Sequence, residues 1–227
     1  LMQKNLSNIN LDRKLLDQIT YLTGSADVIE AMTDVPARVP FSTDICDFLQ
    51  DISKVLMADK RSREYPDIAT FAFWIRNTSV IKLRERFVKE DGTVRLGRGI
   101  AFHVAPSNVP VNFAYSLVSG LLMGNSNIVR VPTKDFPQVE IVIDAFNEVL
   151  RKWKSFIPYI ALVRYERNQK INDILSVIAD IRIVWGGDAT IAELRKSPLP
   201  PRSIEITFAD RYSLAVIDSD VYMGIGD

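Results

Sequence analysis

Absences narrow the function of this 227-residue chain before any motif is considered. Cys46 is the only cysteine and His103 the only histidine, so no intramolecular disulfide and no zinc site of the usual Cys/His kind can form. Lys plus Arg and Asp plus Glu both number 28, and this balance leaves no net field to attract nucleic acid or an anionic membrane. We therefore expect no metal and no nucleic acid partner, and the single free thiol fits a reducing, cytoplasmic setting.

Long apolar runs are also missing. The apolar stretch Ile181–Trp185, for example, is preceded by Asp180 and interrupted by Arg182, so it is far shorter than the roughly 20 residues of a membrane-spanning helix. No segment combines a charged start with an apolar middle, as a signal peptide does. With 47% hydrophobic and 25% charged residues, the composition is that of a globular protein with a substantial core and no membrane span.

The N-terminal part, residues 1–86, predicts helices. Apolar residues recur at near-helical spacing over Leu11–Leu22 and again over Phe48–Leu56, where Ser42 or Thr43 is a candidate cap. A third helix is expected over Pro66–Trp74, because proline is tolerated in a first turn.

A β-hairpin or linker is expected over residues 87–98. Asp91-Gly92 is a turn dipeptide, and it lies between the apolar segments Phe87–Lys89 and Thr93–Leu96. A dipeptide of this kind between two such segments is the strongest short-range signal for a hairpin.

From residue 99 to 227 the pattern alternates between short apolar runs and amphipathic stretches. Repeated strand–helix–strand units predict an α/β fold whose mostly parallel sheet is covered on both faces. The expected strands are Ile100–Ala105, Asn127–Val131, Tyr159–Val163, Ile181–Trp185 and Leu214–Ile217, and the expected helices are Val111–Met123, Val139–Trp153, Ile171–Ile178 and Ala189–Lys196.

The usual nucleotide motifs are absent, since the sequence has neither G-x-G-x-x-G after a strand nor a P-loop. Parallel sheets bind ligands at the carboxyl ends of their strands. After the first such strand comes Pro106–Pro110, with Asn108 at its centre. Asn108 is either a helix cap beside two turn prolines or an amide that donates to a developing oxyanion.

Arg130 lies near the end of the second expected strand, and Thr133 and Lys134 follow it. This segment is either a solvated basic loop or a clamp for a ribose or phosphate, because guanidinium pairs bidentately with phosphate.

Trp185-Gly186-Gly187-Asp188 follows a later strand and opens a short helix. Paired glycines before a helix let backbone N–H groups approach a pyrophosphate. The same letters also describe an ordinary turn with Asp188 as the helix cap, and the charge of Asp188 counts against tight contact with phosphate.

Cys46 and His103 favour structural roles. Cys46 lies among apolar residues of an expected helix, whereas reactive cysteines need partly exposed, electropositive surroundings. His103 lies within an apolar strand. We expect a packed thiol and a hydrogen-bonded core histidine.

Taken together, the motifs resemble a known superfamily. Gly99–Pro110 is similar to the strand and Pro-Trp-Asn-Phe-Pro element of the aldehyde dehydrogenases, and Gly124–Arg130 to their Gly-Asn-(four residues)-Lys segment. Val184–Ala189 falls where these enzymes carry Phe-Thr-Gly-Ser. The variant spellings, with Pro200–Arg202 and Phe208–Ser213, look like the long-chain fatty acyl-CoA reductase branch, which includes the fatty acid reductase of bacterial bioluminescence.

The resemblance covers about residues 90–220 and implies a Rossmann-like sheet of aldehyde dehydrogenase type. It makes Asn108 the oxyanion-hole residue and Arg130 the counterpart of a lysine at the adenosine ribose. Thr133 stands where many NAD-using members have glutamate, so NADPH is expected over NADH. The further cofactor contacts that it implies are Ala105, Pro106, Ser107, Trp185, Gly186, Gly187 and Asp188.

Glu205 is the nearest counterpart of the family's catalytic glutamate, although both glycines of that element are missing. A reductase tolerates this departure, because a water-activating base serves hydrolysis of an acyl-enzyme and not its reduction. In the family the nucleophilic cysteine lies a few dozen residues after this element, so we expect it beyond residue 227 and expect the chain alone to be inactive.

The expected reaction is reduction of an acyl thioester to a fatty aldehyde through a cysteine acyl-enzyme. The resemblance implies an acyl-CoA or acyl-protein donor, acyl-transferring partner enzymes and a homo-oligomer. Two alternatives stay open: an NAD(P)-dependent aldehyde dehydrogenase, and a nucleotide-binding module without catalysis.

Overall fold

The computed structural model describes residues 11–88, 91–211 and 214–218. The strands are β1 (Thr20–Thr23), β2 (Ile100–Val104), β3 (Ser126–Arg130), β4 (Ile160–Arg164), β5 (Ile181–Trp185) and β6 (Ile204–Phe208). They form one sheet in the order β1-β4-β3-β2-β5-β6. Strand β1 is antiparallel to β4, and all other neighbouring strands are parallel. The α/β fold with a mostly parallel sheet is confirmed.

The order of the strands creates a ligand crevice. From β2 the chain proceeds to β3 and β4 on one side, and it then returns to add β5 and β6 on the other side. Outside the carboxyl ends of the strands at such a switch point, here β2 and β5, open parallel sheets bind their ligands.

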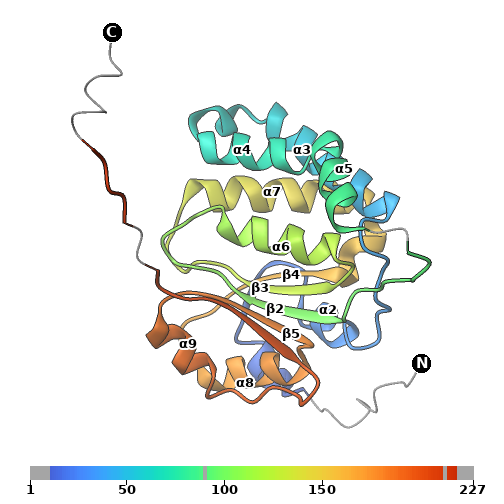
Figure 1. Cartoon of the computed structure of the whole chain (residues 1–227). Coiled ribbons are helices and arrows are strands. Elements are labelled where there is room, and N and C mark those ends of the chain that lie inside the picture. The colour runs from blue at the N-terminus through green and yellow to red at the C-terminus, as the bar shows by residue number, and fades with distance from the viewer. Residues whose placement is uncertain (1–10, 89–90, 212–213, 219–227) are drawn as a thin grey trace.

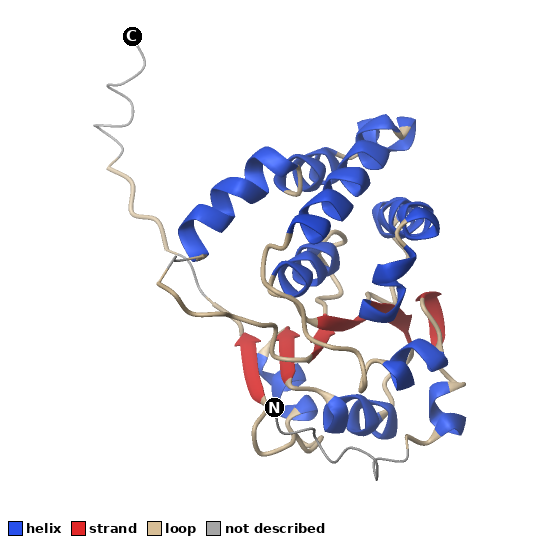
Figure 2. Cartoon of the chain, turned by 90° about the vertical axis from the view of Figure 1, so that its right-hand side faces the viewer, coloured by secondary structure: helices blue, strands red, loops and turns tan. Residues whose placement is uncertain are grey.

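Helices cover both faces of the sheet, so that the molecule has a layered arrangement (Figures 1 and 2). One face carries α6 (Asn112–Leu122) and α7 (Pro137–Lys152), with α3 (Thr43–Ala58), α4 (Pro66–Trp74) and α5 (Asn77–Phe87) outside them. The other face carries α1 (Arg13–Leu16), α2 (Ala26–Ala31), α8 (Gln169–Ile178) and α9 (Asp188–Leu194). Two 3-10 helices, η1 (Lys60–Glu64) and η2 (Lys154–Tyr159), connect elements.

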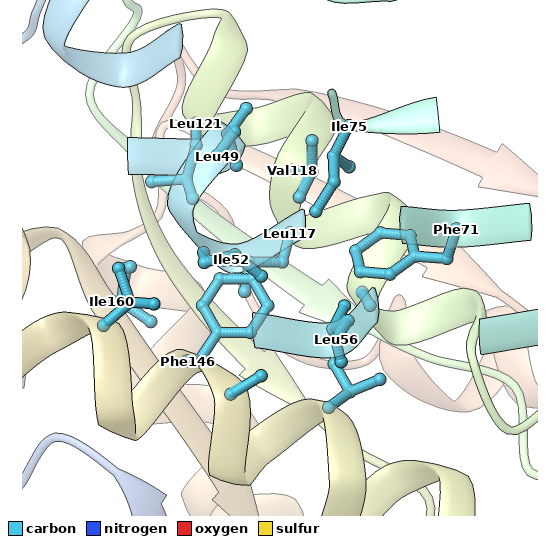
Figure 3. Close-up of a cluster of buried hydrophobic side chains, with 14 of the residues drawn as sticks. Leu49, Ile52, Leu56, Phe71, Ile75, Leu117, Val118, Leu121, Phe146 and Ile160 are labelled. Atoms are coloured by element: carbon cyan, nitrogen blue, oxygen red, sulfur yellow. The ribbon is translucent and has the colours of Figure 1, made fainter. Parts of the chain in front are cut away.

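The larger apolar core lies on the α6–α7 face and joins the N-terminal helices to the sheet. Figure 3 shows the side chains of this core that come from α3, α4, α6, α7 and β4, among them Leu49, Ile52, Leu56, Phe71, Leu117, Leu121, Phe146 and Ile160. Because α3 and α4 bury their apolar stripes against α6 and α7, these two helices and α5 pack as an outer layer of the same body.

Several local predictions are confirmed. Of the two candidate caps, Ser42 occupies the N-cap position of α3, although its side chain makes no capping hydrogen bond, and α4 spans Pro66–Trp74 with its proline in the first turn. Helix α7 begins with Pro137 and ends with Arg151 and Lys152, so its cationic residues complement the negative end of the helix dipole.

Other predictions are wrong. Residues 20–23 form the edge strand β1 and do not continue a helix, because they hydrogen-bond to the edge of β4. The hairpin is absent from the described residues: Phe87 ends helix α5, and Thr93–Leu96 is not a strand. Gly92 does make a turn, with positive φ and a hydrogen bond from the Thr93 amide to the Asp91 carboxylate.

The last strand is also not where the apolar run predicts it. Strand β6 spans Ile204–Phe208 and pairs in parallel register with β5, whereas Leu214–Ile217 is non-regular and highly exposed. Pairing to a neighbour decides the position of a strand, and the run at 214–217 has no such partner among the described strands.

Across the part of the chain that the structure describes, no helix combines the length and apolar character that crossing a membrane requires. In the same residues, His, Cys, Asp and Glu side chains form no cluster of three or more that could hold a metal ion.

Candidate functional site

A pocket of about 950 Å³ lies at the carboxyl ends of the parallel strands. Its size is within the range of about 300–1,000 Å³ that small-molecule sites occupy. The side chains and backbone that line it follow β2, β3, β4, β5 and β6: Val104 to Val109, Asn112, Arg130 to Thr133, Glu166, Arg167, Trp185 to Gly187, Thr190, Phe208 and Asp210. The switch point of the sheet is thus where the pocket is found.

The loop between β2 and α6 presents Asn108 to this pocket. Helix α6 begins at Asn112 with Val111 as its N-cap, so the interpretation of Asn108 as a helix cap is wrong. Asn108 is exposed, and no described group hydrogen-bonds its amide. Its NH₂ group is therefore available to a ligand.

Arg130 ends β3 and is held in place from behind. Its guanidinium lies 4.6 Å from the centroid of the Tyr165 ring and donates to the Tyr165 carbonyl oxygen at 3.1 Å. Burial raises the pKa of Tyr165, whose hydroxyl donates to Asn172 at 2.9 Å. Arg130 is thus partly buried and oriented, in contrast to a freely solvated basic residue.

Thr133 and Arg167 also line the pocket. Thr133 follows β3, which Arg130 ends, and Arg167 follows β4, the neighbour of β3 in the sheet. Arg167 makes no hydrogen bond or ion pair with the described residues. Two guanidinium groups therefore line one cavity, and such a pair favours an anionic ligand such as phosphate. Lys134 is not part of the lining.

The Trp185 side chain forms a flat part of the wall. Its ring stacks on Phe208, with centroids 3.7 Å apart and planes 7° apart, and its Nε1–H donates to the Ser116 hydroxyl at 3.1 Å. Gly187, and not Asp188, occupies the N-cap position of α9, so the interpretation of Asp188 as the cap is wrong. Asp188 is exposed and does not line the pocket.

Gly186 and Gly187 both line the pocket, but a neighbouring carboxylate makes their turn unfavourable for a pyrophosphate. A Cβ at Gly187 would lie 2.6 Å from a carboxylate oxygen of Asp210, so this glycine admits the carboxylate of Asp210. Asp210 also lines the pocket. Negative charge beside the turn opposes a phosphate at the same place, and the arginine end of the pocket suits an anion better.

Glu205 does not line the pocket. It lies on the face of β6 that packs toward α8, where its carboxylate accepts from Arg182 Nε at 2.8 Å and from Arg195 Nε at 2.7 Å. Burial would raise the pKa of Glu205, but the hydrogen bonds from Arg195 and Arg182 outweigh it and lower the pKa. The predicted catalytic role of Glu205 gains no support from this placement.

The residues expected to be structural are structural. His103 is fully buried, with both ring nitrogens hydrogen-bonded, and burial lowers its pKa to about 4. Cys46 is half-buried on α3, its Sγ lies 3.7 Å from the Phe41 carbonyl oxygen, and burial raises the pKa of its thiol. Neither residue lines the pocket.

Sequence reasoning missed several lining residues: Asn112, Glu166, Arg167, Thr190, Phe208 and Asp210. A signal existed for some of them. Asn112 follows Asn108 by four residues, and Glu166-Arg167 follows β4 in the way that Arg130 ends β3. Phe208 and Asp210 were hidden because β6 was not predicted as a strand.

Unpaired polar groups distinguish this pocket. Several polar side chains of the lining have no hydrogen-bond partner within the described residues: Ser107, Asn108, Asn112, Thr133, Glu166, Arg167, Thr190 and Asp210. The Asn112 amide oxygen is even buried without a partner. Buried polar groups in proteins are usually paired, so the buried Asn112 amide oxygen in particular is an acceptor that a ligand could satisfy.

A family model described as acyl-CoA reductase (LuxC) matches residues 82–224, a range that contains the entire lining of the pocket. A comparison with curated proteins finds no match.

Solved aldehyde dehydrogenases share the fold. A NAD-dependent benzaldehyde dehydrogenase from Corynebacterium glutamicum matches with TM-score 0.56 and 14% identity, over 80% of this chain and 44% of its own length. Lactaldehyde dehydrogenase from Escherichia coli matches with TM-score 0.54 and 14% identity, over 86% and 43%. Proline utilization A matches with TM-score 0.55 and 14% identity, over 86% and 23%. This chain spans less than half the length of each of them.

Proposed function

This chain belongs to the acyl-CoA reductase (LuxC) family, and from this premise we propose that it holds the NADPH of an enzyme that reduces a long-chain acyl thioester to a fatty aldehyde. The observation that carries the proposal is the convergence of the Asn108 amide, the two arginines and the Gly186–Gly187 turn on a single pocket inside the matched residues. The acyl donor is proposed to be acyl-CoA or an acyl-protein, supplied by acyl-transferring partner enzymes, and the protein to be a homo-oligomer.

The residues present fit one end of a dinucleotide well. Arg130 and Arg167 provide cationic donors for a phosphate of the adenosine half, and Thr133 leaves out the carboxylate that would repel a 2′-phosphate. Asp210 beside Gly187 disfavours a phosphate at the glycine turn. We therefore place the phosphate preference at the arginines and infer NADPH over NADH from them.

Asn108 is proposed to be the oxyanion donor. When bound, the nicotinamide supplies the hydride that reduces the thioester carbon. The carbonyl oxygen gains negative charge as this happens, and the unpaired amide of Asn108 is free to donate to it. Expulsion of the sulfur as thiolate, which takes up a proton, would then yield the aldehyde, so that one thioester, one NADPH and one proton give aldehyde, thiol and oxidised cofactor.

The nucleophile is proposed to be a cysteine outside residues 1–227. Cys46 does not serve this role, because its pKa is raised by burial and it does not line the pocket. Covalent capture would split thioester reduction into acyl transfer and hydride transfer. Glu205 is engaged with Arg182 and Arg195, so we assign it no step.

The decisive experiment measures acyl-CoA-dependent oxidation of NADPH by the full-length protein and its Asn108→Ala variant. Loss of one oxyanion donor should lower kcat by ~10²–10³-fold, while the dissociation constant of NADPH stays within about twofold, since the amide acts on the acyl group and not on the phosphates. Aldehyde oxidation without acyl-CoA reduction, or full activity of Asn108→Ala, would overturn the proposal.

Cofactor preference is tested by the Arg130→Ala variant. A charge-assisted hydrogen bond contributes about 1.5–3 kcal/mol, so NADPH binding should weaken by roughly tenfold or more while NADH binding changes little. Lys134→Ala is the matched control, because Lys134 is a neighbouring cation outside the pocket. Equal affinity of the wild-type protein for NADH and NADPH would contradict the inferred preference.

A further inference from the structure

A chain of hydrogen bonds runs from the wall of the pocket into the buried core. The Trp185 Nε1–H donates to Ser116 Oγ at 3.1 Å, and Ser116 Oγ lies 2.8 Å from His103 Nδ1. His103 Nε2 lies 3.0 Å from Asn127 Oδ1, and Asn127 Nδ2 donates to the Asn125 carbonyl oxygen at 2.7 Å. Ser116, His103 and Asn127 are buried, so only Trp185 meets the pocket.

The chemistry of the last acceptor fixes every proton in this chain. The Asn125 backbone carbonyl can only accept, so Asn127 must direct its NH₂ group there and its oxygen toward His103. His103 then carries its proton on Nε2, which leaves Nδ1 as an acceptor for the Ser116 hydroxyl. The Ser116 oxygen is thereby free to accept from Trp185. The neutral histidine is the form that completes the chain, and burial keeps it neutral.

Gly120 gives independent evidence that the network is built into the fold. It lies in the last turn of α6, and glycine is a poor helix former compared with alanine. A Cβ at this position would lie 1.8 Å from Asn127 Oδ1 and 3.2 Å from His103 Nε2. The close approach of the helix to the His103–Asn127 pair thus explains why a poor helix former occupies this position.

Two contacts together fix the indole of Trp185. Stacking on Phe208 sets the plane of the ring, and the hydrogen bond to Ser116 sets its rotation within that plane. Trp185 is half-buried, and its polar edge is tied to the core through the buried Ser116.

We propose that Ser116 and His103 are positioning residues, which act through Trp185 by presenting its indole as a fixed flat wall for a planar ring of the cofactor. The inference rests on the proposed function in one respect, because it takes the ligand of the pocket to be the nicotinamide cofactor. The hydrogen-bonded network itself does not depend on that assignment, and this separation shapes the test.

The first measurement follows the indole N–H signals of the 227-residue chain by ¹⁵N NMR. Trp185→Phe, which keeps an aromatic ring for stacking but removes the N–H, assigns the signal. Ser116→Ala should shift the Trp185 signal and raise its hydrogen exchange by about fivefold, since loss of one hydrogen bond is typically worth about 1 kcal/mol. The Trp153 signal should stay, because its N–H donates to Asp51 at 3.0 Å.

Two further variants control this measurement. Ser116→Thr retains a hydroxyl and should restore the Trp185 signal. Ser119→Ala removes an exposed hydroxyl from the same helix, which donates to the Tyr115 carbonyl oxygen, and should leave all indole signals in place. An unshifted Trp185 signal in Ser116→Ala would overturn the network itself.

The second measurement is a double-mutant cycle on NADPH binding by the full-length protein. Ser116→Ala should raise the dissociation constant by about 2–10-fold when Trp185 is present and by less than about 1.5-fold in the Trp185→Phe background, because the effect passes through the indole N–H. Equal effects in both backgrounds would overturn the positioning role while leaving the proposed function intact. No binding of NADPH or NADH to the wild-type protein would overturn the proposed function and this role together, whereas the NMR result would still establish the network.

Discussion

The α6–α7 face of the sheet has two unlike halves. Over β4, β3 and β2 its side chains are buried under helices, with Leu162 at 0% exposure. Over β6 the corresponding side chains are exposed to solvent, with Ile206 at 42% exposure. The pocket lies where the two halves meet, at the ends of β2 and β5. The covered half provides a rigid scaffold, and the open half provides an apolar surface beside the site.

The opposite face of β6 shows that this difference is specific to one side. There Glu205 pairs with the buried Arg182 and is covered from the side of α8. The strand therefore turns its charged residue toward the protein and its apolar residues Ile204, Ile206 and Phe208 outward. This is the reverse of the usual arrangement for an edge strand, and contiguous exposed apolar surface marks a contact site.

The largest effect is expected from truncating the covered half. Leu162 and Ile206 are both the third residue of a five-residue strand and face the same side of the sheet. Leu162→Ala should lower the free energy of unfolding by about 2–5 kcal/mol, since it leaves a cavity in a close-packed core. Ile206→Ala should cost less than about 1 kcal/mol. Urea denaturation of the two variants measures both values.

Similar losses in the two variants would contradict the comparison. They would mean that Ile206 is covered in solution, by a second copy of the chain for example. Repeating the denaturation over a concentration series separates these cases, because stabilisation by association depends on protein concentration.

The next effect tests how the open half is held from its other side. Glu205→Gln should lower the free energy of unfolding by about 2–3 kcal/mol, because Arg182, with a side chain 3% exposed, loses its counter-charge. The partial exposure of Glu205 keeps the loss at the lower end of what buried pairs show. Arg195→Ala removes the exposed partner and should change stability by less than about 0.5 kcal/mol.

The same Glu205→Gln variant bears on catalysis. Because Glu205 does not line the pocket, acyl-CoA reduction by the full-length variant should fall by less than about threefold at temperatures where it is folded. A rate loss as large as that of Asn108→Ala, with stability unchanged, would restore the catalytic assignment that the sequence suggested.

A third effect depends on pH and reports the covered half. Burial depresses the pKa of His103 in the folded protein to about 4 from an ordinary 6.5, so between these values the unfolded chain binds a proton that the folded chain refuses. Stability is therefore complete above about pH 6.5 and falls as the pH falls toward 4. Between pH 6.5 and 5 the loss should be about 2 kcal/mol, measured by urea denaturation at each pH.

His103 is the only histidine, which makes the control simple. His103→Gln is less stable at neutral pH, but its stability should change little between pH 6.5 and 5, because carboxylates titrate mainly at lower values. A wild-type protein whose stability is flat over this window would show that His103 is not sealed in the core.

The sequence predicted the covered half better than the open half, and the reason is physical. Buried parallel strands are rich in β-branched and other apolar residues, as β2 and β4 are, and β3 has Ile128 and Val129 at its centre, so these strands could be located from local sequence. Strand β6 alternates apolar and polar residues, and its position is set by pairing with β5, which local sequence does not encode. The more apolar Leu214–Ile217 therefore has the stronger local signal for a strand.

The site divides in the same way. Asn108, Arg130 and Gly186–Gly187 stand directly at the ends of predicted strands, and the structure brings all of them to one pocket. Phe208 and Asp210 depend on the placement of β6, and the ion pairs of Glu205 depend on which face of that strand meets α8. Distant pairing decided these features, so local spacing could not.

The smallest effect on stability, and the most direct probe of the open half, comes from charging it. Ile206→Lys should change the free energy of unfolding by less than about 0.5 kcal/mol, as is usual for exposed positions. It should nevertheless reduce self-association of the 227-residue chain. A lysine among the exposed apolar residues Ile204, Ile206 and Phe208 opposes burial of this surface against another molecule. Sedimentation velocity over a concentration series measures this.

Met57→Lys, on the exposed side of α3 at 47% exposure, adds the same charge elsewhere and should leave association unchanged. If both variants reduce association equally, net charge is responsible, and the two halves of the face do not differ as contact surfaces.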